Sequence, residues 1–131
     1  MRAEGLAGAV RDLREETREH ALQLEQVFRA VGAEPSSNLS PPAETLADHH
    51  EQLAGAISDD RLADVFHAAT AIATEHHALA AYESLLGLAD AVGLDGGACG
   101  LLERNRDEEA RALERLRGEL PRLVRALAER S

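Results

Sequence analysis

The chain has 131 residues, a mass of 14.1 kDa and a net charge of −10 at pH 7, with 24 acidic residues against 14 basic ones. This length favours one domain spanning residues 1–131. The negative charge argues against nucleic acid and anionic membrane surfaces as partners.

Alanine, leucine, glutamate and arginine dominate the sequence, whereas valine and isoleucine are scarce. The abundant residues are strong helix formers and the scarce ones are typical of strands, so we expect an all-α protein. Cys99 is the single cysteine, which excludes a disulfide within the chain. No signal peptide or membrane-spanning run is visible, so we expect a cytoplasmic protein.

The first predicted helix covers residues 3–31, because apolar residues recur there at alternating spacings of four and three from Leu6 to Val31. Gly32 supplies a C-terminal stop. The following residues, 33–40, have the composition of a loop.

A second, shorter helix is predicted over residues 41–57, with Ser40 as its N-cap and Pro41 in its first turn. Ser58, Asp59 and Asp60 separate it from a third helix over residues 60–92, which Gly93 ends. A fourth helix is predicted over residues 97–130. We expect Pro121 to kink or break it, because proline lacks the backbone donor and clashes with the preceding turn.

Long helices joined by short loops pack side by side, so this pattern predicts a ferritin-like antiparallel four-helix bundle with one short helix and a Pro-kinked C-terminal helix. The short helix leaves apolar surface of the long helices uncovered. Dimerisation is one way to bury such a surface, and we therefore expect a homodimer.

Polar residues interrupt each apolar stripe near its middle. We take Thr17 and His20 to lie on the first stripe, with Glu16 beside it, and His76 and Glu83 on the third, with Glu75 beside it. Asn105 and Glu109 lie on the fourth stripe next to Glu108, and His50 lies on the second. Burying unpaired charge is expensive, so groups at matching depth are expected to satisfy one another or a metal.

Carboxylates and imidazole inside a four-helix bundle are typical of di-iron carboxylate proteins, and they suit iron or manganese. The candidate metal ligands are Glu16, His20, Glu75, His76, Glu108 and Glu109. The Glu-x-x-His pair of such sites is absent from the sequence, but Glu16 and His20, at i and i+4, share one helix face. Two alternatives remain open: a zinc site on His20, His76 and His50, or a metal-free network of hydrogen bonds.

Several segments resemble the YciE/YciF-like branch of the ferritin-like proteins. Residues 15–32 (EETREHALQLEQVFRAVG) resemble the second helix of that family, and residues 75–95 (EHHALAAYESLLGLADAVGLD) resemble its EHYEIAAY helix with the GLD turn. Residues 101–109 (LLERNRDEE) look like its last helix, and residues 43–46 like the start of its short connecting helix. Together the likeness covers residues 13–117, and its most specific part is EHxxxAAY.

This resemblance implies a ferritin-like bundle, usually dimeric, associated with bacterial stress responses and suspected of holding a di-iron centre. Glu16, Glu75 and Glu108 fall on acidic positions of the family motifs. The chain departs from them at Leu13, Ala78 and Arg104, and it lacks the family's first helix. The two leading hypotheses are therefore a metal protein with a reduced site and ferroxidase-type chemistry, and a metal-free bundle that acts as a structural dimer or binds a partner.

Overall fold

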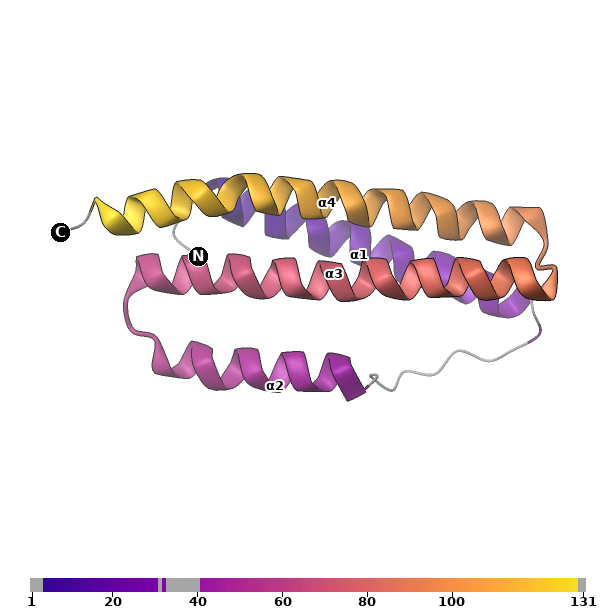
Figure 1. The fold of residues 1–131 in the computed structure, drawn as a ribbon, viewed down its shortest axis with the longest axis horizontal. Helices are drawn as coiled ribbons and strands as arrows, with labels where there is room; N and C mark the ends of the chain where they lie inside the picture. Colours follow the sequence, from indigo (N-terminus) through magenta and orange to yellow (C-terminus); the bar gives the residue numbers. More distant parts are fainter. Residues whose placement is uncertain (1–3, 31, 33–40, 130–131) are drawn as a thin grey trace.

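The computed structural model describes residues 4–30, 32 and 41–129, and this part of the chain forms four helices. They are α1 (Glu4–Ala30), α2 (Pro41–Ala56), α3 (Asp60–Val92) and α4 (Gly96–Ala128) (Figure 1). The predicted all-α class is confirmed, and every predicted helix boundary lies within two residues of the observed one. The predicted cap Ser40 and the side chains of residues 41–47 lie outside the described residues.

Three long helices form the body of the molecule, and successive helices alternate in direction (Figure 1). Helix α4 packs against both α1 and α3, while α2 contacts α3 alone among the described helices. Because α2 has about half the length of α3, it accompanies only the first part of that helix. In the described residues, no helix combines the length and apolarity that a membrane crossing requires.

The ends of α3 are fixed by local capping hydrogen bonds, which the sequence predicts. The Asp59 side chain accepts hydrogen bonds from the backbone N–H groups of Arg61 and Leu62, both at 3.0 Å. Gly93 ends the helix in the left-handed conformation, with φ of 69°, which favours glycine. At the start of α4, Asp95 accepts a hydrogen bond from the Gly97 N–H at 2.8 Å.

Pro121 does not break α4, which continues to Ala128. Pro121 is exposed, so the carbonyl that loses its intrahelical partner can be hydrated. The residues after Pro121 extend α4 along the bundle: Leu123 is buried, and the Arg61 guanidinium donates a hydrogen bond to the Ala126 carbonyl at 3.1 Å. This tail therefore packs against the N-terminal ends of α1 and α3.

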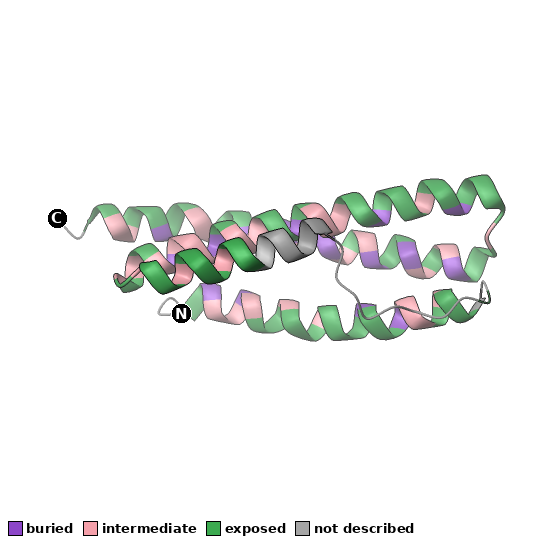
Figure 2. Cartoon of the chain, turned by 90° about the horizontal axis from the view of Figure 1, so that it is seen from below, coloured by how far each residue is buried: buried purple, intermediate pink, exposed green. Residues whose placement is uncertain are grey.

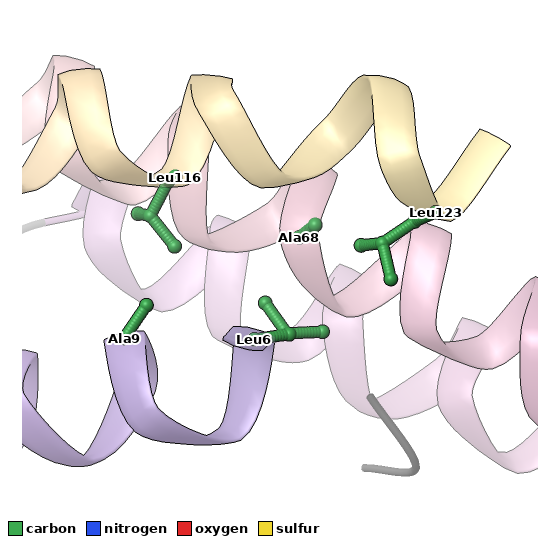
Figure 3. Packing of buried hydrophobic residues seen from close by; sticks show 5 residues of the cluster. All are labelled: Leu6, Ala9, Ala68, Leu116 and Leu123. Atoms are coloured by element: carbon green, nitrogen blue, oxygen red, sulfur yellow. The ribbon is translucent and has the colours of Figure 1, made fainter. Parts of the chain in front are cut away.

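The aliphatic core of the bundle lies at that end and consists of Leu6, Ala9, Ala68, Leu116 and Leu123 (Figure 3). Half-buried side chains such as Val10, Leu13 and Ile72 surround it. The core lies where α1, α3 and α4 meet, so burial of aliphatic side chains holds the three long helices together.

The buried face of α3 repeats every seven residues rather than following the predicted stripe. Its buried residues include Ala68, Glu75, Tyr82 and Ala89 (Figure 2). A seven-residue repeat is typical of helices packed along one another at a shallow angle. Glu75 consequently points into the bundle, whereas His76 and Glu83, which were predicted on the stripe, are exposed.

Candidate metal site: a carboxylate–histidine cluster

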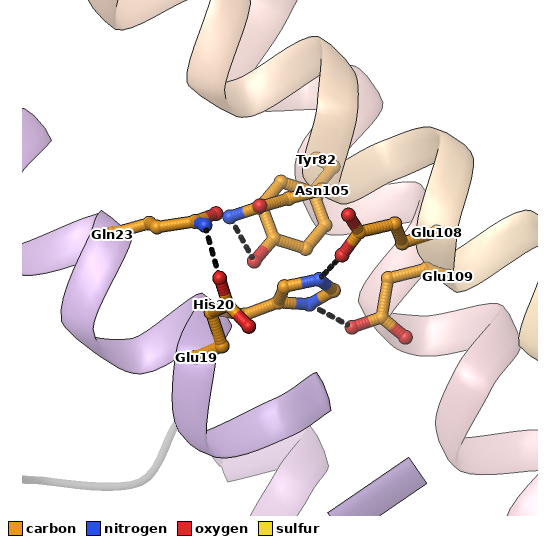
Figure 4. Close-up of polar contacts among 7 residues, drawn as sticks. All are labelled: Glu19, His20, Gln23, Tyr82, Asn105, Glu108 and Glu109. Carbon is orange, nitrogen blue, oxygen red and sulfur yellow. Dashed lines mark hydrogen bonds and ion pairs between the residues drawn. The ribbon is translucent and has the colours of Figure 1, made fainter. Parts of the chain in front are cut away.

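His20 forms the centre of a polar cluster between α1 and α4. Its Nδ1 lies 2.8 Å from Oε1 of Glu109, and its Nε2 lies 2.7 Å from Oε2 of Glu108 (Figure 4). Since both ring nitrogens face carboxylates, the ring can donate two hydrogen bonds only as imidazolium. Burial opposes that charge, but the bonds to Glu109 and Glu108 outweigh it and raise the pKa of His20.

Glu75 brings a third helix into the cluster and carries a proton at neutral pH. Burial, followed by a hydrogen bond and charge repulsion with Glu109, raises the pKa of Glu75 to about 9. Burial alone would raise the pKa of Glu109 as well, but the bonds from His20 and Glu75 lower it. Glu109 is thus the carboxylate that accepts hydrogen bonds from both neighbours.

Glu16, one helical turn before His20, completes the cluster. Burial first, and then repulsion from Glu108, raises the pKa of Glu16, although the His20 charge opposes the shift. The structure therefore gathers five of the six predicted ligands from three helices, and we call them the carboxylate–histidine cluster: Glu16, His20, Glu75, Glu108 and Glu109.

Apart from the proton that Glu75 shares with Glu109, three buried carboxylate oxygens of this cluster find no hydrogen-bond donor among the described residues. They are Oε2 of Glu16, Oε2 of Glu75 and Oε2 of Glu109. Buried polar atoms are nearly always satisfied in folded proteins, so three such oxygens on three helices mark a site with unused binding capacity.

A second layer of polar side chains covers the cluster toward the C-terminal end of α1. Asn105, fully buried, donates a hydrogen bond from Nδ2 to the Tyr82 hydroxyl at 3.3 Å, and the Tyr82 ring meets the His20 ring edge-on at 6.0 Å. Burial, with the nearby carboxylates opposing ionisation, raises the pKa of Tyr82 to about 12. Gln23 is also buried and donates to Glu19 at 3.3 Å (Figure 4).

Sequence reasoning missed Gln23 as a member of this layer. The signal was present, because Gln23 follows Glu16 by seven residues and His20 by three, which places all three on one helix face.

A groove of about 290 Å³ between α1 and α3 leads to the cluster. His20, Tyr82 and Glu109 lie among its lining residues. The other lining side chains are mostly apolar: Thr17, Ala21, Leu24, Ala78, Ala81 and Leu85. We call it the α1–α3 groove. A small molecule in it would meet an apolar wall before it met the polar cluster.

His76 is the predicted ligand that the structure does not bring to the others. Its side chain is exposed, with Nε2 2.7 Å from a guanidinium nitrogen of Arg117. The physical reason is the seven-residue repeat of α3, which turns Glu75 inward and its neighbour outward. The three histidines of the zinc alternative also lie apart: His20 bonds to α4, His76 faces Arg117, and His50 stacks on Phe66.

Within the described residues, no group of three or more His, Cys, Asp or Glu side chains is arranged to hold a metal ion. The hydrogen bonds of the cluster explain this, because both nitrogens of His20 are engaged by carboxylates. A metal ion at His20 would have to displace these hydrogen bonds.

Comparison with known proteins gives a family and one solved relative. The sequence profile of the family described as "Domain of unknown function (DUF892)" matches residues 1–129. A solved structure described as "YcfI, a putative structural protein from Rhodopseudomonas palustris" has 30% sequence identity and a TM-score of 0.82, and the match covers 88% of this chain and 73% of that one. A search of curated proteins found no match.

Proposed function

This chain belongs to the DUF892 family, and we propose that it is a ferritin-like protein of the YciE/YciF type that binds iron or manganese in its carboxylate–histidine cluster. The observation that carries this proposal is the gathering of four carboxyl groups around the buried imidazole of His20. Buried oxygens of Glu16, Glu75 and Glu109 find no donor there besides the proton of Glu75. A purely structural core would have no reason to collect four carboxyl groups around one imidazole.

The donor set fits such a metal. Carboxylate oxygens and one imidazole are ligands that iron and manganese accept, and they come here from three helices of one bundle. Glu75, Glu109, His20 and Glu16 would hold the ion, with Glu108 at the edge. The protons on Glu75 and His20 now balance the charge that the ion would balance.

Metal binding would therefore release protons, and affinity should rise with pH as Glu75 and His20 lose theirs. When bound, iron in such a site supplies ferroxidase-type chemistry, the oxidation of Fe(II) by dioxygen or peroxide. The chain's own residues would have three further roles. Glu109 accepts hydrogen bonds and Glu75 holds a proton. The α1–α3 groove lets a small oxidant reach the cluster. A stress-associated role in the bacterial cytoplasm is part of this proposal.

The test is metal binding by the untagged protein. We expect anaerobic titration with Fe(II) or Mn(II), followed by calorimetry and mass spectrometry, to give one or two ions per chain. The double variant Glu75→Gln/Glu109→Gln should lose this binding, because the amides keep the side-chain volumes but not the anionic ligands.

Glu83→Gln/Glu114→Gln is the matched control, since it removes two exposed carboxylates from the same two helices. Equal binding by the two double variants would contradict the proposal and identify the bound ions as surface-associated.

A second candidate function is a structural homodimer that needs no metal. Leu85, Leu88 and Val92 follow one another along α3 and are 42%, 63% and 75% exposed, and Leu85 also lines the α1–α3 groove. An exposed apolar strip beside a groove is typical of a protein interface. The solved relative is described as a structural protein, which supports this candidate.

Sedimentation equilibrium of the wild type and of Leu88→Glu tests it. A dimer that Leu88→Glu converts to a folded monomer would support this interface, and Val124→Glu, on the exposed surface of α4, serves as the control. A wild type that stays monomeric at high micromolar concentration would exclude it.

A further inference from the structure

Two imidazoles face each other where α2 meets α3, on residues that the carboxylate–histidine cluster does not use. The His50 ring lies 5.2 Å from the His67 ring, centroid to centroid, at an interplanar angle of 44°. His50 also stacks on Phe66, with the ring centroids 5.1 Å apart and the planes at 10°. This stacking fixes the orientation of His50 between the two helices.

A second cavity, of about 220 Å³, lies beside the His50 and Phe66 rings, and His67 does not line it. Its lining residues are His49, His50, Phe66, Ala69, Thr70 and Ala73. The Nδ1 atom of His50 is buried and has no hydrogen-bond partner among the described residues. A buried ring nitrogen is normally satisfied, so this atom is available to a ligand.

We propose that His50 and His67 bind one first-row transition-metal ion, Zn²⁺ or Cu²⁺, between α2 and α3. Two imidazoles that ligate the same tetrahedral ion at about 2.0 Å place their ring centroids about 5 Å apart, which matches the observed separation. Water would complete the coordination sphere of an ion held by these two rings, and the cavity beside His50 is large enough to supply it.

The surroundings favour this ion over a simple ring contact. Burial, and then the neighbouring His50, lowers the pKa of His67, which keeps its ring neutral with a free lone pair at pH 7. Asp64 lies one turn before His67 and is near enough to act on its charge, as carboxylates behind metal-bound histidines do. The net charge of −10 also attracts cations to the surface.

An ion at this position would act as a clamp on α2. None of the described side chains of α2, residues 48–56, is buried, so this part of the helix has little hydrophobic attachment of its own to α3. A ligand from each helix would tie them together, and binding to the folded state alone would stabilise that contact.

The experiment titrates Zn²⁺ into the full chain in the Glu75→Gln/Glu109→Gln background, so that the carboxylate–histidine cluster does not contribute. We expect one Zn²⁺ per chain, with His50→Gln and His67→Gln each weakening the affinity by at least about tenfold. His77→Gln, which removes an imidazole from the same helix α3 outside this cavity, should change it by less than about twofold. Continuous-wave EPR of the Cu²⁺ form should show coupling to two imidazole nitrogens.

Hydrogen exchange supplies an independent readout. Amides of α2 should gain protection on adding Zn²⁺ to the wild type and not to His67→Gln. The His67 variant decides the question if His50→Gln loosens α2, because it leaves His50 stacked on Phe66. Unchanged affinity in His67→Gln, or a loss in His77→Gln equal to that in His67→Gln, would overturn the proposal in favour of chelation by other histidines.

Discussion

The aliphatic core and the carboxylate–histidine cluster are built from the same three helices, but burial has opposite effects on the stability of the two regions. Leu116 and Glu109 lie about two turns apart on α4, and both are almost inaccessible to solvent. In the core, burial removes apolar surface from water and stabilises the fold. In the cluster, burial raises the pKa of Glu75 and forces protons onto groups that are charged in water.

This difference separates the aliphatic contacts, which carry stability, from the cluster, which carries chemistry. The core has no titratable member, so its contribution to the free energy of unfolding should not depend on pH. The cluster holds its protons only while the pH allows it. Burying these titratable groups costs free energy, and the neighbouring core shows that the same helices can pack with aliphatic side chains alone. A buried polar centre in such a bundle is typical of a functional site.

The largest expected effect on the free energy of unfolding comes from a substitution in the aliphatic core. Leu116→Ala removes a side chain that is 1% exposed and packs between the long helices, and it should lower the free energy of unfolding by about 3 kcal/mol. Urea unfolding followed by circular dichroism measures this. Leu22→Ala, at a side chain 61% exposed, should change it by less than about 0.5 kcal/mol. Equal losses would show that the core does not dominate stability.

The next effect removes the only cation of the cluster. His20→Gln deletes the charge-assisted bonds to Glu108 and Glu109 and should cost about 2 kcal/mol at pH 6 in the metal-free protein, a figure discounted because Glu108 is 26% exposed. The loss should shrink toward pH 9. The pKa of His20 is higher in the folded than in the unfolded protein, so its charge stabilises the fold fully below the unfolded pKa. This stabilisation disappears as the pH rises through the folded pKa. A loss that is constant from pH 6 to 9 would contradict an imidazolium at this position.

The helix boundaries could be predicted because each depends on a few neighbouring residues. Asp59 and Gly93 define the ends of α3 through local capping bonds, whatever the rest of the chain does. The cluster members on α1 and α4 could also be predicted, because the strong apolar stripes of those helices make a polar interruption visible.

The buried face of α3 could not be predicted in the same way. Alanines flank both sides of its stripe, so the pattern does not distinguish the face with Glu75 and Tyr82 from the face with His76 and Glu83. Packing against α4 selects the face, and no local pattern records that choice. The His50–His67 contact was missed for a similar reason, since it depends on how α2 lies against α3.

A smaller expected effect is the pH dependence of stability that Glu75 gives the cluster and that the aliphatic core lacks. Because the pKa of Glu75 is raised to about 9, the folded protein binds this proton more tightly than the unfolded chain, so stability falls as the pH rises from about 4.5 to 9. Glu75→Gln should abolish that fall and raise the free energy of unfolding at pH 8.5 by about 2 kcal/mol, within the limit of about 1.4 kcal/mol per pH unit.

Thermal unfolding with a chelator present, at pH 5.5 and 8.5, measures this effect. Glu83→Gln removes an exposed carboxylate of α3, and it should behave as the wild type at both pH values. A variant at Glu75 that is less stable than the wild type at pH 8.5 would show that its carboxyl group is structural rather than held for a ligand.

The smallest expected effect tests where the cluster ends. Tyr82→Phe keeps the ring that meets His20 edge-on but removes the hydroxyl that accepts a hydrogen bond from Asn105, and it should cost about 1 kcal/mol. The double variant Tyr82→Phe/Asn105→Leu should recover part of this loss, because no buried amide is then left without its partner. Since neither side chain ligates in the proposed site, Fe(II) or Mn(II) affinity should stay within about twofold of the wild type. A larger change in affinity would extend the site to this layer. Unfolding curves and metal titrations of the two variants and the wild type separate the two outcomes.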